Sequence, residues 1–318
     1  MPVTEVTFED IQRAAERIKG IAQRTPVMTS HTFDAKSGVQ AVFKCENFQK
    51  GGAFKIRGAA NFLYSIPKAD LPKGVVAYSS GNHAQAVAIA AKSVGAPATL
   101  VMPEDAPRSK MEATRAQGPR IITYDRFKDD RGAIGAKISA ETGATLVPPY
   151  DHPWTIAGQG TTALELRDQA PDLEALVVCI GGGGLIAGCA IAAKHLKPSI
   201  RIFGVEPADA NDTYLSLRAG KRVEIPAPAT IADGLRSQLP GELTFPVIQK
   251  HVEQILLVTD DEIRATVKFL LTRMKILVEP SGAVSAAAAM FGKLPPGLGR
   301  VGIVLSGGNV DFEQLAGF

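Results

Sequence analysis

The sequence is 318 residues long and 45% hydrophobic, which is enough for a large core in one large domain or two modest ones. It carries 35 Lys and Arg against 32 Asp and Glu, a formal net charge of +3. Because these charges form no basic stripe along the chain, the sequence argues against a nucleic-acid partner.

The cysteines and the N-terminus indicate a reducing compartment. Cys45, Cys179 and Cys189 are an odd number and form no CxxC pair. Each lies in apolar surroundings, so buried free thiols are expected rather than disulfides or zinc ligands. The N-terminus has no apolar signal core, and no uncharged apolar run of about 18 residues occurs. We therefore expect a cytoplasmic protein with no membrane partner.

The first half of the chain predicts a helix and then alternating strands and helices. Thr7 caps a helix whose apolar residues recur at helical spacing up to Ile18, and which we expect to end at 24–26. A segment of mixed apolar character, 40–46, leads to a helix that begins near Phe54. Further strands are expected at 74–78, 98–102 and 120–124, and helices at 82–94, 108–117 and 129–142.

The second half repeats this rhythm around a loop-rich, proline-containing stretch, 225–239. Helices are expected at 157–169, 185–195, 260–274 and 281–290, and strands at 175–180, 200–205, 254–258 and 301–305. Strands separated by helices of this length form parallel sheets that are covered on both faces. Since no flexible linker is visible, the sequence predicts an α/β protein of two interwoven lobes.

Lys55 follows two glycines, Gly51 and Gly52, and lies at the start of a predicted helix. A helix N-terminus disfavours a positive charge, and the neighbouring Lys50 and Arg57 disfavour it further. Such effects lower the pKa of a lysine from about 10.4 towards roughly 7–8, where the free amine can form a Schiff base. The alternative is a solvated lysine in a turn, and three motifs downstream favour the reactive amine.

The first of these motifs, Ser79-Ser80-Gly81-Asn82-His83, follows a strand and opens a helix. Backbone N–H groups converge at such a place, so the motif can hold a carboxylate or a phosphate without a cation. The alternative is an ordinary N-cap turn, because Ser, Gly and Asn are common at helix starts.

The second motif is a run of four glycines, 181–184, between an apolar strand and a helix. A loop without side chains and with several free N–H groups fits a phosphate. The run matches neither GxGxxG nor GxxxxGK[ST], which weakens a dinucleotide or ATP interpretation.

The third motif, Ser306-Gly307-Gly308-Asn309, closes the last predicted strand. A serine there points its hydroxyl into the crevice where open α/β sheets bind ligands, although a capped turn is equally consistent with the pattern.

Two further patterns bear on metals and on hydrolysis. Glu206, Ala210 and Asp212 follow a strand with oxygen donors at spacings that could hold a hard cation, but acidic loops are common. The histidines are scattered without metal-ligand or triad spacing, and no GxSxG elbow is present, so a Ser/His/Asp hydrolase is not supported.

Taken in this order, Lys55 and the three motifs resemble the fold type II, or tryptophan-synthase-β-like, pyridoxal-phosphate enzymes over essentially the whole chain. Within them the serine/threonine dehydratase and serine racemase group is the most similar. The resemblance implies a large cofactor-binding domain of residues 1–73 and 152–318 and a small mobile domain of residues 74–151. It also implies a homodimer in the cytoplasm that acts on a small amino acid.

The resemblance assigns roles to individual residues. Lys55 matches the catalytic lysine that binds pyridoxal 5′-phosphate, and Ser80 matches the acid/base serine proposed in the racemases. The other cofactor-binding positions would be Phe54, Asn82, Gly181, Gly182, Gly183, Gly184, Leu185 and Ser306. The substrate carboxylate would lie against Ser79, Ser80, Gly81, Asn82 and His83. A divalent cation, Mg, Ca or Mn, would be held by Glu206, the carbonyl of Ala210, and Asp212.

This resemblance implies a lyase that eliminates water from L-serine or L-threonine to give a 2-oxo acid and ammonia, with serine racemase side activity. A rival activity is that of a 3-hydroxyaspartate dehydratase, whose second substrate carboxylate needs a cationic partner. Arg131 is the candidate for that partner and His152 the reserve. β-Replacement on O-acetylserine is a further enzymatic possibility, and a non-catalytic amino-acid-binding protein is the possibility from a different class.

Overall fold

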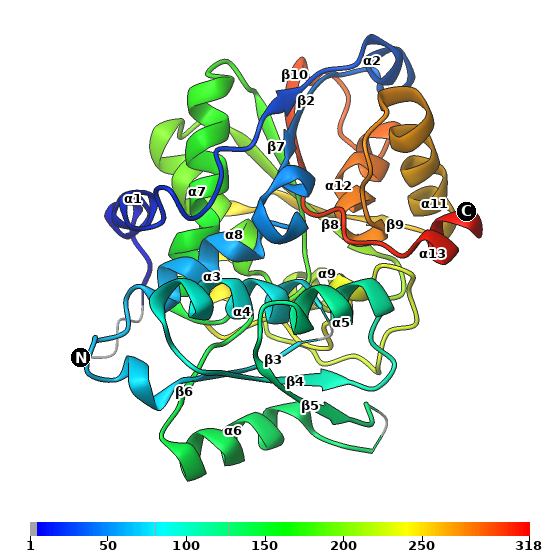
Figure 1. Ribbon diagram of the computed structural model, residues 1–318. Helices are drawn as coiled ribbons and strands as arrows, with labels where there is room; N and C mark the ends of the chain where they lie inside the picture. The colour runs from blue at the N-terminus through cyan, green and yellow to red at the C-terminus, as the bar shows by residue number, and fades with distance from the viewer. Residues whose placement is uncertain (1–4, 80, 127) are drawn as a thin grey trace.

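The computed structural model describes residues 5–79, 81–126 and 128–318, and its strands form two sheets (Figure 1). The large sheet has six strands in the order β1 (Val27–Met28), β2 (Gln40–Cys45), β10 (Arg300–Leu305), β7 (Ala175–Cys179), β8 (Arg201–Pro207) and β9 (Gln254–Val258). The small sheet has the order β5 (Arg120–Tyr124), β4 (Ala98–Pro103), β3 (Val75–Tyr78) and β6 (Thr145–Leu146). All neighbours run parallel except β1 and β2.

Helices fill the connections between these strands. In the part of the chain that the structure describes they are α1 (Phe8–Arg17), α2 (His31–Ser37), α3 (Lys55–Leu63), α4 (Asn82–Val94), α5 (Arg108–Arg115), α6 (Arg131–Thr142), α7 (Pro153–Gln169), α8 (Gly184–Leu196), α9 (Asp212–Ala219), α10 (Thr244–His251), α11 (Asp260–Phe269), α12 (Pro280–Met290) and α13 (Phe312–Ala316). Short 3₁₀ turns lie at Glu46–Phe48, Lys50–Gly52, Leu71–Lys73 and Asp233–Leu235. None of the described helices is long and apolar enough to cross a membrane.

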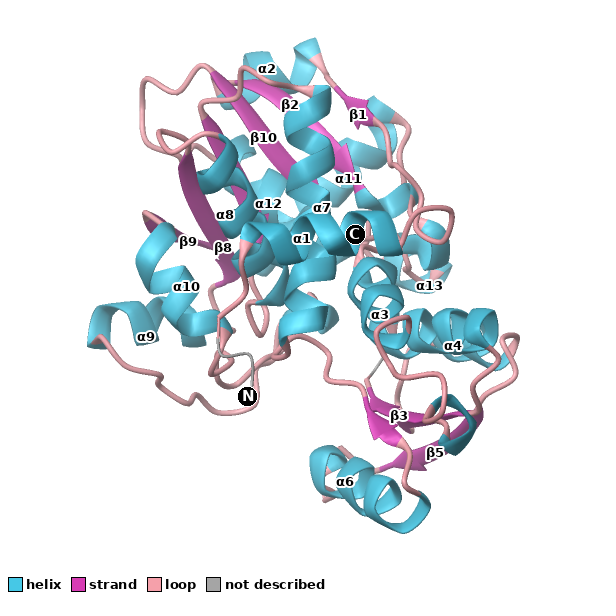
Figure 2. Cartoon of the chain, turned by 90° about the vertical axis from the view of Figure 1, so that its left-hand side faces the viewer, coloured by secondary structure: helices cyan, strands magenta, loops and turns pink. Residues whose placement is uncertain are grey.

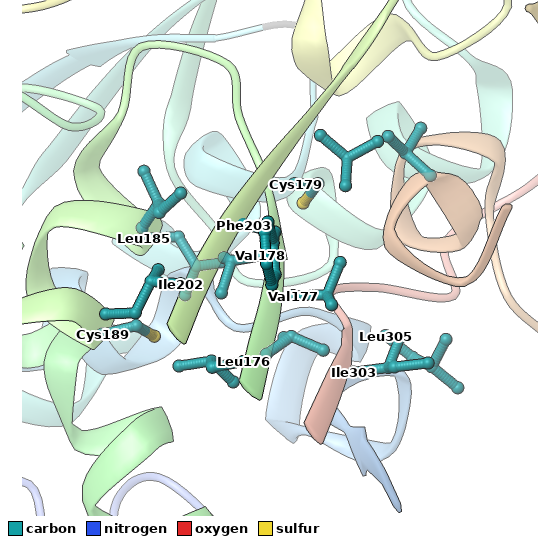
Figure 3. Close-up of a cluster of buried hydrophobic side chains, with 14 of the residues drawn as sticks. Leu176, Val177, Val178, Cys179, Leu185, Cys189, Ile202, Phe203, Ile303 and Leu305 are labelled. Carbon is teal, nitrogen blue, oxygen red and sulfur yellow. The ribbon is translucent and has the colours of Figure 1, made fainter. Parts of the chain in front are cut away.

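The core of the large lobe forms on both faces of its sheet, because its central strands are apolar at nearly every position. All five residues of β7 are buried, and so are six of the seven in β8. Figure 3 shows side chains of β7, β8 and β10 packed with Leu185 and Cys189 of α8 in one apolar cluster. Strands buried on both sides are what helices on two faces of a parallel sheet require.

The core of the small lobe follows the alternation of its strands. Val75 and Ala77 of β3 point to one face, where they pack with α3 and α4. Val76 and Tyr78 point to the other face, where Ile134 of α6 covers them. Figures 1 and 2 show that α3 and α4 lie between the two sheets, with α6 on the far side of the small one. Two interwoven α/β lobes are thus confirmed, whereas the boundaries at 73/74 and 151/152 stay a prediction.

Helix ends show where the sequence was interpreted correctly and where it was not. The bounds of α4 are as predicted, because Gly95 adopts a left-handed φ of +70° directly after Val94. The first helix ends at Arg17 and not at 24–26, since Gly20, at φ +78°, turns the chain away. The helix expected at 260–274 is α-helical only to Phe269 and ends in a π-helical turn, Leu270–Met274.

Candidate active site

A cavity lies between the two lobes at the carboxyl ends of their strands, where open α/β sheets bind ligands. The large lobe contributes residues that follow β7 and β10, and the small lobe contributes residues that follow β3 and β5. The described residues that line it include Phe54, Lys55, Ser79, Asn82, His83, Arg131, Gly181 to Gly184, Leu185 and Ser306, and also Tyr78, Lys110, Tyr124, Arg126, Pro149, Tyr150, Cys179, Asp233, Arg236, Glu279 and Ser281.

Lys55 is the first residue of α3, and its amine lies in the cavity. The Nζ atom donates to the carbonyl of Pro149 at 2.8 Å and lies 5.0 Å from the centre of the Phe54 ring. Burial lowers the pKa of Lys55 to about 8, because an ammonium group loses hydration there. The low pKa that the sequence suggested is therefore present, but burial causes it rather than the charges of Lys50 and Arg57.

Arg57 fixes the start of α3 instead of acting on Lys55. Its guanidinium is fully buried and donates to both carboxylate oxygens of Glu46, at 2.7 and 2.8 Å, and to both of Glu165, at 2.7 and 2.8 Å. Lys44, also fully buried, donates to Glu165 at 2.7 Å. Two cations and two anions thus balance each other between α3, β2 and α7, which ties the helix that carries Lys55 to the large lobe.

The four glycines lie between β7 and α8, and close contacts explain three of them. A Cβ atom on Gly182 would lie 2.3 Å from the ring of Tyr150, and one on Gly184 would lie 2.9 Å from the Cβ of Tyr150. Gly183 has a φ of +92°, and a Cβ atom there would lie 2.7 Å from Oγ1 of Thr244. The loop therefore presents backbone at the start of α8, where N–H groups and the helix dipole favour an anion.

Ser306 lies directly after β10 and is 4% exposed. The backbone N–H of Phe54 donates to its carbonyl at 3.1 Å, and Ala53 forms a β-bridge with Gly307. These contacts hold the segment before Lys55 against the end of β10. Burial raises the pKa of the neighbouring Cys179 thiol, so this cysteine stays protonated and packs as an apolar side chain.

The motif 79–83 joins β3 to α4, and Ser80 lies outside the described residues. The N–H of Gly81 donates to Oγ of Ser79 at 3.2 Å. Asn82 donates from Nδ2 to Oε1 of Glu279 at 2.5 Å, so its amide already has a protein partner besides the cofactor that the resemblance assigns to it. His83 is buried, with Nε2 at 3.0 Å from the carbonyl of Val147, and burial lowers its pKa to about 3. It is therefore neutral.

Several charged residues in the cavity were missed by the sequence interpretation, among them Lys110, Asp233 and Glu279. Lys110 of α5 lies 2.8 Å from Asp233 and 2.8 Å from Glu279, and both Lys110 and Glu279 are almost fully buried. These partners are 123 and 169 residues from Lys110 in sequence, and no local pattern marks such a pairing. Only the apolar surroundings of Glu279, between Val278 and Pro280, could have suggested a buried carboxylate.

The two candidates for a second substrate carboxylate lie in different places. Arg131 lines the cavity from the first turn of α6, with Cζ 5.7 Å from the centre of the Tyr78 ring. Arg126, which the sequence interpretation did not single out, also lines it and pairs with Asp105 at 2.7 Å. His152 is not among the described cavity residues. It caps α7 and packs against aromatic rings.

The acidic motif after β8 forms a buried pair of carboxylates. Glu206 accepts from the backbone N–H groups of Thr213 and Tyr214 at 3.1 and 2.8 Å. Both carboxylate oxygens of Asp212 are buried without a partner among the described residues. Burial, and for Glu206 also repulsion by Asp212, raises the pKa of Glu206 well above its usual range, and burial raises that of Asp212 to about 7.

Two carboxylates and a nearby buried Ala210 suit a hard cation, because such ions prefer oxygen ligands and would relieve this repulsion. Among residues 5–79, 81–126 and 128–318, however, no cluster of three or more His, Cys, Asp or Glu side chains is arranged to hold a metal. Any cation here would depend on carbonyl groups or water for its remaining ligands.

Comparison with known proteins extends these observations to the whole chain. A family model described as "Pyridoxal-phosphate dependent enzyme" matches residues 18–307. The chain is 49% identical over 312 residues to a serine racemase of Schizosaccharomyces pombe, covering 98% of this chain and 97% of that protein. It is 49% identical over 310 residues to an L-threo-3-hydroxyaspartate ammonia-lyase of Saccharomyces cerevisiae, covering 98% and 95%. The solved structure of maize serine racemase matches with a TM-score of 0.94 at 44% identity, covering 98% of this chain and 96% of that one.

Proposed function

The chain belongs to the pyridoxal-phosphate dependent enzymes, and from this premise we propose that it is an ammonia-lyase that eliminates water from L-serine or L-threonine. The observation that carries the proposal is the buried amine of Lys55, with its pKa near 8, in a cavity that also contains a glycine loop and Ser306. A non-catalytic binding protein would have no need of such an amine. The products would be a 2-oxo acid and ammonia.

The residues of the cavity fit the cofactor. Lys55 would bind it covalently, the loop of Gly181 to Gly184 with Leu185 would hold its phosphate, and Ser306 would offer a neutral hydroxyl to its ring nitrogen. Phe54 would pack against its ring, and Asn82 would lie beside it. The cofactor, when bound, delocalises the electron pair left at the substrate Cα after proton removal.

The chain itself supplies binding and proton transfer. With a pKa near 8, a useful fraction of Lys55 is the free base at neutral pH and can take the α-proton. The segment from Ser79 to His83 would bind the substrate carboxylate at the start of α4, where a helix N-terminus favours an anion. The glycine loop leaves no side chain in the way of an anion, so it would hold the phosphate while the segment 79–83 holds the carboxylate.

Absorbance and product formation test this function together. We expect the wild-type protein to gain a visible absorbance band with pyridoxal 5′-phosphate and to form 2-oxo acid from L-serine. Lys55→Ala should lose both, whereas Lys73→Ala, which changes an exposed lysine paired with Asp70, should lose neither. A protein that stays colourless and inert after cofactor addition would be a binder. Turnover of O-acetylserine with sulfide instead of L-serine would identify β-replacement.

A second candidate substrate is L-threo-3-hydroxyaspartate, and the position of Arg131 favours it. This guanidinium lines the cavity, and no ion pair of Arg131 is present among the described residues. A charge-assisted contact with a second carboxylate contributes about 1.5–3 kcal/mol, which is roughly ten- to a hundredfold in kcat/KM. Arg131→Met should then lower kcat/KM for hydroxyaspartate but not for L-serine. Arg115→Met, which changes an exposed arginine of the same lobe, is the control.

Some serine racemase activity is part of the proposal. It depends on the match of Ser80 to the acid/base serine of the racemases. Ser80→Ala should reduce the formation of D-serine more than the formation of 2-oxo acid from L-serine. An equal reduction of both would mean that Ser80 only positions the substrate.

The proposal also includes a divalent cation at Glu206, Ala210 and Asp212, supported by the buried, partnerless carboxylate of Asp212. Its role would be structural or activating, since none of these residues is among those that line the cavity. The mobile small lobe, the homodimer and the cytoplasmic location stay predictions, and sedimentation of the purified protein would test the dimer.

A further inference from the structure

Lys110 is a buried lysine that reaches from one lobe to the other. It belongs to α5 of the small lobe and is 3% exposed. Its ammonium lies 2.8 Å from Oδ2 of Asp233 and 2.8 Å from Oε2 of Glu279, both in the large lobe. Lys110 and Glu279 are both almost fully buried, so the loss of either one would leave the other a buried charge without its main partner.

The second oxygen of Glu279 extends this contact into the cavity. It accepts from Nδ2 of Asn82 at 2.5 Å, while Oδ1 of Asn82 accepts from Asn309 at 3.0 Å. Asn309 in turn donates to the carbonyl of Gly51 at 2.7 Å. The amide of Asn82 therefore has one orientation, with its donor on Glu279 and its acceptor on Asn309.

The aliphatic part of Lys110 supports the same loop from behind. A Cβ atom built on Gly81 would lie 2.2 Å from Cδ of Lys110, 3.1 Å from its Cγ and 3.2 Å from its Cβ. The stem of the lysine thus runs along the backbone of Gly81. One side chain both packs against the start of α4 and is tied by its charge to the opposite lobe.

We propose that Lys110 is a positioning residue: by bridging Asp233 and Glu279 it holds Glu279 against Asn82 and holds the backbone of Gly81 in place. The segment that binds the substrate carboxylate is then complete only while the ion pair joins the lobes. This inference depends on the proposed function only in assigning residues 79–83 to the substrate carboxylate. It differs from a direct role, in which the Lys110 ammonium would itself bind a second carboxylate of the substrate.

The ionisation of these groups agrees with this role. Burial raises the pKa of Glu279, and the charge of Lys110 acts in the opposite direction. Glu279 and Asp233 together keep Lys110 charged despite its burial. Lys110 therefore stays a cation and is not a proton donor in the reaction, which leaves removal of the α-proton to Lys55.

The test compares holoenzyme variants by a measurement that needs no turnover. Glycine has a carboxylate but no leaving group, so the absorbance change of the cofactor on glycine addition gives a dissociation constant. Lys110→Met should raise this constant by up to about a hundredfold, by analogy with the cost in rate when a group is misplaced by about an ångström. It should also accelerate amide hydrogen exchange at the start of α4. Lys73→Met should change neither.

Two further variants show how Lys110 acts. Lys110→Arg keeps the charge and should restore much of the glycine affinity. Glu279→Gln should weaken glycine binding, and the double variant Lys110→Met/Glu279→Gln should lose no more than the worse single variant, because both remove the same link. If the losses of glycine affinity in the two single variants multiply in the double variant, Lys110 and Glu279 act independently, and the proposal is overturned.

The substrates separate positioning from direct contact. A positioning role predicts that Lys110→Met raises KM by a similar factor for L-serine and for L-threo-3-hydroxyaspartate. A loss confined to hydroxyaspartate would make Lys110 a substrate contact and overturn the proposal. Wild-type glycine binding without turnover of any hydroxy amino acid would reject the proposed function and leave this inference standing.

Gly81→Ala covers the case in which Lys110→Met does not fold. Its new methyl group displaces the stem of Lys110 without changing any charge. We expect the same weaker glycine binding and faster exchange. Glycine affinity and exchange at the wild-type level in Gly81→Ala would overturn the proposal.

Discussion

Replacing Lys55 by methionine should stabilise the cofactor-free protein at neutral pH. The amine lies in a fully buried position, and burial lowers its pKa from the ordinary value of 10.5 to about 8. At about pH 7 most of the group is protonated in the folded state and nearly all of it in the unfolded state, so the folded state bears the cost of burying the ammonium. Methionine has a similar length and carries no charge.

The magnitude follows from the pKa difference. The interval from 10.5 to about 8 corresponds to roughly 3 kcal/mol, at 1.36 kcal/mol per pH unit. The variant also loses the hydrogen bond to the Pro149 carbonyl, which costs about 1 kcal/mol. We therefore expect a net gain in the free energy of unfolding of roughly 2 kcal/mol at about pH 7.

The pH dependence of the stability difference separates the effect of Lys55 ionisation from the other effects of the substitution. Between about pH 8 and 10.5 the unfolded state binds more protons at Lys55 than the folded state, so the wild-type free energy of unfolding rises with pH relative to the variant. Above about 10.5 the amine is neutral in both states and the advantage of the variant disappears. Urea unfolding of both apo proteins at several pH values measures this difference. The reasoning would be refuted if the variant were no more stable than the wild type at about pH 7. It would also be refuted if the difference in the free energy of unfolding were the same at every pH.

Three other changes have expected outcomes. Arg57→Met leaves the fully buried Glu46 without its guanidinium, whereas the partly exposed Glu165 keeps Lys44, and it should lower the free energy of unfolding by about 3–5 kcal/mol in urea. A loss below about 1 kcal/mol would match an exposed pair and contradict the buried network. Gly182→Ala forces a methyl group to within 2.3 Å of the Tyr150 ring and should weaken cofactor binding in equilibrium dialysis, and unchanged binding would contradict the assignment of the loop. After treatment with EDTA at about pH 8, added Mg²⁺ or Ca²⁺ should raise the melting temperature of the wild type but not that of Asp212→Asn. Without metal, Asp212→Asn should melt at a higher temperature than the wild type. The reason is that the pKa of Asp212 is raised to about 7, so its ionised form destabilises the folded state at about pH 8. A wild-type melting temperature that ignores both EDTA and cations would remove the metal site.

The family could be inferred from the sequence because its motifs are local. Each of them is a short run that begins where a predicted strand ends, and parallel strands bring their carboxyl ends to one edge of a sheet. The order of Lys55, the segment 79–83, the glycines at 181–184 and Ser306 was therefore enough to identify a fold type II pyridoxal-phosphate enzyme, and the matches over nearly the whole chain confirm it.

The features that could not be predicted from the sequence depend on contacts between residues that are far apart in the chain. The contacts of Lys110 with Asp233 and Glu279 join separate helices and loops, and no local pattern in the sequence pairs these residues. The same holds for β1 and β6, which are two residues long and exist only because a neighbouring strand pairs with them. The cause that the sequence suggested for the low pKa of Lys55 was likewise wrong, because burial is a property of the whole fold.

The position of β10 in the middle of the large sheet has a consequence for how the chain is made. This strand pairs with β2 on one side and with β7 on the other, so the last 19 residues of the sequence complete a sheet begun near residue 27. During synthesis, β2 must wait for nearly the entire chain before β10 can pair with it, whereas β3 to β6 are contiguous in sequence and can assemble early. A chain truncated before β10 would therefore have a folded small lobe and a large sheet with unpaired, aggregation-prone edges. Chaperones and proteases act on products of this kind.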